Sequence, residues 1–103
     1  MAVTSKDEII RRLTANSDTI KQMGVKRLGL FGSFVRGQQQ DTSDVDILVE
    51  YQPGTKTYRN FLATADYLEK LLDAKVDLVT QESVSPYIAP HIQQEINYVQ
   101  ISD

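Results

Sequence analysis

The chain has 103 residues, of which 41% are hydrophobic and 24% charged, as in an ordinary globular domain. We expect residues 1–103 to form a single domain with one core and no separate substrate domain. The 11 basic and 14 acidic residues leave a net charge of −3, which argues against duplex nucleic acid as a partner. No apolar run approaches the roughly 20 residues that span a bilayer, and the first residues do not resemble a signal peptide. We therefore expect a cytoplasmic protein without a membrane partner.

Helices are predicted from capping residues and from apolar residues at helical spacing. They cover about residues 5–24, 33–37, 58–72 and 90–97. Ser5 and Glu8 form a capping-box pattern at the start of the first helix, and Gly24 ends it. Ser33 is expected to cap the short second helix, and Pro90 suits the first turn of the last one.

Strands are predicted where apolar residues cluster between these helices. They cover residues 25–31, 44–51 and 75–80. Residues 98–101 are either a further strand or a frayed end. Helix and strand signals thus alternate along the chain, which indicates a domain that contains both.

Three aspartates interrupt two of the apolar runs. Asp44 and Asp46 are two residues apart in a predicted strand, so they point to the same side of it and repel unless a divalent cation lies between them. Asp77 joins them if its strand lies alongside. Magnesium prefers such hard oxygen ligands, and two ions can stabilise the attacking and leaving oxygens of a phosphoryl displacement. We therefore predict Asp44, Asp46 and Asp77 as catalytic metal ligands, with Asp77 nearest the acceptor.

A Gly-Ser step follows the first predicted strand and suits the binding of a phosphate group. Gly32 lets the backbone approach without a Cβ atom, and Ser33 offers its hydroxyl and N–H at a helix start. Arg36 lies about one helical turn further and could reach a phosphate or a neighbouring carboxylate. Together with the acids, this turn indicates metal-assisted chemistry on a nucleoside triphosphate.

Three segments resemble the minimal nucleotidyltransferase family of the DNA polymerase beta-like superfamily. They are Gly-Ser-Phe-Val-Arg-Gly at 32–37, Ser-Asp-Val-Asp-Ile-Leu-Val at 43–49 and Val-Asp-Leu-Val at 76–79. The resemblance implies an α/β (α+β) fold, a small mixed β-sheet flanked by helices. It also implies two Mg²⁺ ions on the three aspartates, ATP as the substrate, and nucleotide binding by Gly32, Ser33, Arg36 and Ser43. Val35 stands where small residues are common in the family, and the linker before Ser43 is rich in glutamine.

The resemblance also implies a biological setting. Stand-alone family members are typically paired with HEPN-domain toxins in prokaryotic toxin–antitoxin modules, in which they are the antitoxins and transfer AMP to a tyrosine hydroxyl of the toxin. Two alternatives stay open: a non-catalytic antitoxin that acts by contact, and a transferase for a small-molecule hydroxyl. The three acids weigh against the first, and the lack of an acceptor-binding domain weighs against the second. Apolar residues between Tyr87 and Ile96 are candidates for a partner surface, and a homo-oligomer also stays open.

Overall fold

The computed structural model describes residues 3–40 and 42–102. Along the chain the elements are α1 (Lys6–Ala15), α2 (Ser17–Gln22), β1 (Val25–Phe31), α3 (Ser33–Arg36), β2 (Val45–Tyr51), α4 (Tyr58–Leu72), β3 (Val76–Thr80), the 3₁₀ turn η1 (Gln81–Ser83), α5 (Ala89–Glu95) and β4 (Asn97–Gln100). The strands form a four-stranded sheet in the order β3-β2-β1-β4. Strand β1 is antiparallel to β2 and β4, and β2 is parallel to β3. The fold is the small mixed sheet flanked by helices that the motifs implied.

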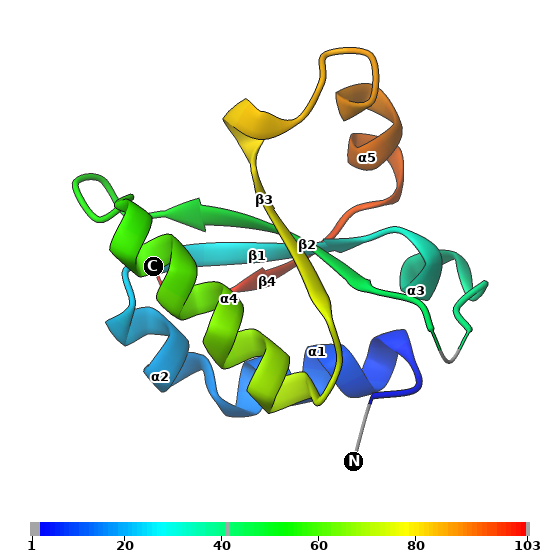
Figure 1. Cartoon of the computed structure of the whole chain (residues 1–103), viewed down its shortest axis with the longest axis horizontal. Helices are drawn as coiled ribbons and strands as arrows, with labels where there is room; N and C mark the ends of the chain where they lie inside the picture. Colours follow the sequence, from blue (N-terminus) through cyan, green and yellow to red (C-terminus); the bar gives the residue numbers. More distant parts are fainter. Residues whose placement is uncertain (1–2, 41, 103) are drawn as a thin grey trace.

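The hydrophobic core lies between one face of the sheet and helices α1, α2 and α4, which gather on that side (Figure 1). Val45, Ile47 and Val49 of β2 alternate along the strand, point into the core and are at most 2% exposed. Leu28 and Leu30 of β1 pair with Val49 and Ile47, so they lie on the same face. This face therefore supplies most of the apolar burial that holds the fold together.

The opposite face of the sheet is covered in part by α5 and the residues that follow it. Ile96 packs so closely on Gly29 of β1 that a Cβ atom at that glycine would collide with it. Ile92 of α5 is also buried. Asp46 and Leu48 belong to this face, because they alternate with the core residues of β2. The predicted chemistry thus lies on the side of the sheet away from the core.

The predicted N-terminal helix is in fact two helices, α1 and α2. Asn16 leaves the helical conformation between them, and its Nδ2 donates to the carbonyl oxygen of Arg12 at 2.8 Å. The start of α1 was predicted correctly, because Ser5 Oγ accepts the N–H of Glu8 at 3.2 Å. Apolar residues at helical spacing, Ile9, Leu13 and Ile20, are buried on the inner face of the pair.

Helices α3 and α5 also differ from the prediction, each at one end. Gly32 is the capping residue of α3, and Ser33 is the first residue of that helix rather than its cap. Helix α5 ends before Asn97, because the next residues pair with β1 as β4. The segment at 98–101 is therefore largely a strand. None of the described helices has the length and apolar character needed to cross a membrane.

Candidate active site

Asp46 and Asp77 lie side by side on neighbouring strands. The parallel pairing of β2 with β3 places them directly opposite one another. Asp46 is half-buried, whereas Asp77 is exposed on the edge strand. Asp44 is exposed and lies just before β2, two residues from Asp46. The condition for Asp77 to join the other acids, a strand alongside that of Asp46, is therefore met.

Burial and the neighbouring carboxylates raise the pKa of Asp46 from 3.8 to about 6. Burial of its carboxyl group is the largest cause, and the carboxylates of Asp77, Asp44 and Glu95 raise the pKa further. The guanidinium of Arg36 acts in the opposite direction. Ionising Asp46 is thus unfavourable in the protein alone, and a cation beside it would remove much of that cost.

The chemistry of these oxygen donors fits a hard divalent cation. Magnesium often takes only one or two carboxylates from a protein, while water and substrate phosphates complete its coordination. Among residues 3–40 and 42–102, no three His, Cys, Asp or Glu side chains are grouped so that they could hold a metal ion by themselves. The pair of Asp46 and Asp77 fits an ion that is shared with substrate. A site built from all three aspartates stays a prediction.

Gly32 turns the chain directly beside Asp46. Its φ of +84° lies in the region that favours glycine. A Cβ atom added at this position would collide with Oδ2 of Asp46. From the sequence, a glycine was expected here so that a phosphate could approach the backbone. The contact with Asp46 is a more direct reason for it. Glycine is needed here so that the turn and the Asp46 carboxylate can be neighbours.

The two predicted serines have different surroundings. Ser33 follows Gly32 as the first residue of α3 and is partly exposed. Ser43 closes the loop before β2, because its Oγ accepts the backbone N–H of Gln40 at 2.8 Å. Contact of either serine with a nucleotide stays a prediction.

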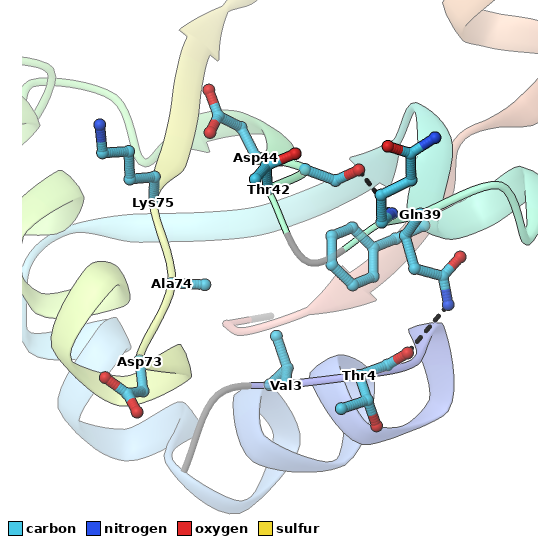
Figure 2. Close-up of a pocket in the computed structure, with 11 residues that line it drawn as sticks. Val3, Thr4, Gln39, Thr42, Asp44, Asp73, Ala74 and Lys75 are labelled. Atoms are coloured by element: carbon cyan, nitrogen blue, oxygen red, sulfur yellow. Dashed lines mark hydrogen bonds between the residues drawn. The ribbon is translucent and has the colours of Figure 1, made fainter.

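A cavity of about 680 Å³ lies next to Asp44. Figure 2 shows Val3 and Thr4 on one side of it, and Asp73, Ala74 and Lys75, which connect α4 to β3, on the other. Its volume is in the range of sites that take a small molecule. Of the three predicted acids Asp44 lines this cavity, whereas Asp46 and Asp77 do not.

Glu95, at the end of α5, is a site residue that the sequence did not reveal. Its Oε2 accepts the N–H of Gly32 at 2.6 Å, and its two oxygens accept from Nη1 of Arg36 at 2.9 and 3.0 Å. Arg36 was expected to reach a phosphate or a neighbouring carboxylate, and the carboxylate is this one. Glu95 lies 63 residues from Gly32 in the chain, so no local motif includes both. Only the pairing of β4 with β1 brings them together.

Comparison with known proteins agrees with this geometry. Residues 13–99 match the family model described as a nucleotidyltransferase domain. The protein adenylyltransferase MntA of Thermococcus cleftensis is 39% identical over 100 residues, which span 96% of this chain and 100% of that protein. A crystal structure of a toxin-antitoxin with AMP-PNP has a TM-score of 0.61 and 27% identity, over 81% of this chain and 71% of the other. A mutant of the toxin-antitoxin MntA-HpeT has a TM-score of 0.63 and 26% identity, over 98% and 76%. The chain therefore belongs to the nucleotidyltransferase family, as its motifs indicated.

Proposed function

We propose that this chain transfers AMP from ATP to a hydroxyl group of a HEPN-domain toxin, and so acts as its antitoxin. The observation that carries the proposal is the pair of Asp46 and Asp77 beside the turn at Gly32. Similarity to the adenylyltransferase MntA supports AMP as the transferred group. Similarity to toxin-antitoxin structures, one of them with AMP-PNP, supports ATP and a toxin as partners.

In the proposed reaction a tyrosine hydroxyl of the toxin attacks the α-phosphorus of ATP. A bond forms between the tyrosine oxygen and this phosphorus, and the bond from the phosphorus to the oxygen that bridges to the β-phosphate breaks. Pyrophosphate leaves with the electron pair. The hydroxyl proton passes to the carboxylate of Asp77, which is exposed on the edge strand, within reach of a large acceptor.

The other residues bind and orient the nucleotide in this proposal. Ser33 donates its hydroxyl to the triphosphate, and Arg36 donates to a phosphate oxygen. Asp44, Asp46 and Asp77 would hold Mg²⁺, which when bound neutralises phosphate charge and lowers the pKa of the acceptor hydroxyl.

Part of the predicted partner surface is available for docking. Tyr87 is 88% exposed and Ile88 is 54% exposed, just before α5. Ile92 is buried in the protein and cannot contribute. We therefore assign the first part of the stretch between Tyr87 and Ile96 to the partner surface.

A transfer assay with labelled ATP tests the proposal. The chain is incubated with Mg²⁺ and with the HEPN-domain protein that we expect in the neighbouring reading frame, using ATP labelled at the α- or at the γ-phosphate. We expect label on the toxin from α-labelled ATP only, and none with Asp46→Asn. The matched control is Asp66→Asn, an exposed aspartate paired with Lys70 on α4, which should keep the wild-type rate. Label from the γ-phosphate, or no label from either, would contradict the proposal.

A further inference from the structure

We infer that Glu95 is a positioning residue for nucleotide binding, because its carboxylate holds both ends of the helix that carries Ser33. The inference rests on the proposed function, since it assigns Glu95 a role in binding the ATP of that reaction. Gly32 caps the start of α3, Arg36 is its last residue, and Glu95 bonds to both.

The helix needs such support because it is very short. Helix α3 has 4 residues, whereas isolated helices of fewer than about 12 residues are marginal in water. The three bonds from Glu95 are 2.6, 2.9 and 3.0 Å long. Those to Arg36 join two charged groups, and charge-assisted bonds of this kind are stronger than neutral ones. The side chain of Glu95 is 23% exposed and that of Arg36 is 48% exposed, so water competes for the ion pair in part.

The position of Glu95 is fixed by the sheet. Strands β1 and β4 pair antiparallel, with Leu30 opposite Asn97. Gly32 follows the end of β1, and Glu95 ends α5 two residues before Asn97, so this pairing brings the end of α5 next to the turn. Glu95 is thus held between the end of α5 and the start of a paired strand, which fixes its position relative to the turn.

Arg36 keeps a donor for a ligand while Glu95 holds it. Its Nη1 binds Glu95 and its Nε donates to Gln38 at 3.1 Å. In the part of the chain that the structure describes, its Nη2 donates to no residue. The guanidinium can therefore be oriented by Glu95 and bind a phosphate at the same time, so the carboxylate need not leave when ATP enters.

The test compares Glu95→Ala with Glu50→Ala. Glu50 is a matched control, because it also pairs with an arginine, Arg27, at 2.8 Å, and its side chain is 22% exposed. It lies near the end of β2 that is away from Asp46. Affinity for AMP-PNP with Mg²⁺ is measured by isothermal titration calorimetry, and folding by urea unfolding. We expect Glu95→Ala to weaken binding about tenfold and Glu50→Ala to leave it unchanged. In an Arg36→Ala background, the further loss from Glu95→Ala should be much smaller.

Glu95→Gln keeps the size of the side chain and carries the same test if the alanine variant does not fold. It should bind AMP-PNP more weakly than the wild type, because one oxygen and the charge are lost. Unchanged affinity in the folded variants would show that Glu95 only supports the fold. Tighter binding would show that it competes with phosphate for Arg36. Either result would overturn the inference and leave the proposed function standing. A wild-type chain that does not bind AMP-PNP would overturn both.

Discussion

Replacing Asp46 with asparagine should stabilise the metal-free protein at neutral pH. The pKa of Asp46 rises from 3.8 to about 6 on folding. Compared with its ionised form, the protonated carboxyl group of Asp46 favours the folded state. This contribution is complete below pH 3.8, where the group is protonated in both states, and it is lost as the pH rises through about 6. At neutral pH the ionised carboxylate therefore costs stability. A neutral amide of nearly the same shape avoids that cost.

The size of the effect follows from the pKa and the exposure. A rise from 3.8 to about 6 corresponds to about 3 kcal/mol if fully realised. Because Asp46 is only half-buried, water screens the repulsion, and we expect about 1–2 kcal/mol. No hydrogen bond to a described residue contributes to the pKa of Asp46, so the amide should break none.

Urea unfolding with a metal chelator measures this difference. Wild type, Asp46→Asn and the control Asp66→Asn are compared at about pH 7.5 and about pH 4. We expect Asp46→Asn to be the most stable at the higher pH and to lose most of its advantage at the lower one, while Asp66→Asn stays within about 0.5 kcal/mol of wild type. An Asp46→Asn variant no more stable than wild type at the higher pH, or an advantage that does not depend on pH, would refute the reasoning.

Three further substitutions test other parts of the site. Gly32→Ala should destabilise the fold by more than about 2 kcal/mol and Gly37→Ala by about 1, because both have positive φ but only the first methyl group meets Asp46; equal losses in urea unfolding would contradict the collision. Ser33→Ala should weaken ATP binding by about 1–2 kcal/mol through one lost hydrogen bond, as calorimetry would show, and an unchanged affinity would make this serine structural. Asp77→Asn should lose most of the transfer of α-labelled AMP while keeping much of the ATP affinity, and a wild-type rate would remove Asp77 from the site.

The parts of the fold that depend on local patterns could be predicted from the sequence. The alternation of Val45, Ile47 and Val49 identified the buried face of β2, because side chains on a strand alternate between its faces. The same rule placed Asp46 on the other face. The place of Asp77 depended on the pairing of two separate strands, so the sequence could state only the condition that the structure meets.

Features that depend on tertiary contacts could not be predicted in this way. Glu95 reaches Gly32 through the register of β1 and β4, and no spacing in the sequence encodes that register. On α4, Tyr58 and Leu62 follow the apolar spacing but are 78% and 49% exposed. Periodicity marks the apolar face of a helix, but it does not tell how much of that face the rest of the protein covers.

The mass of the toxin after incubation with the chain, ATP and Mg²⁺ tests the central claim most directly. The account predicts that wild type adds AMP to the toxin and that Asp46→Asn adds none, although this variant should be at least as stable as wild type. Loss of transfer would then reflect the site and not the fold. Addition of AMP by Asp46→Asn at the wild-type rate, or an unmodified toxin after incubation with the folded wild-type chain, would contradict the account.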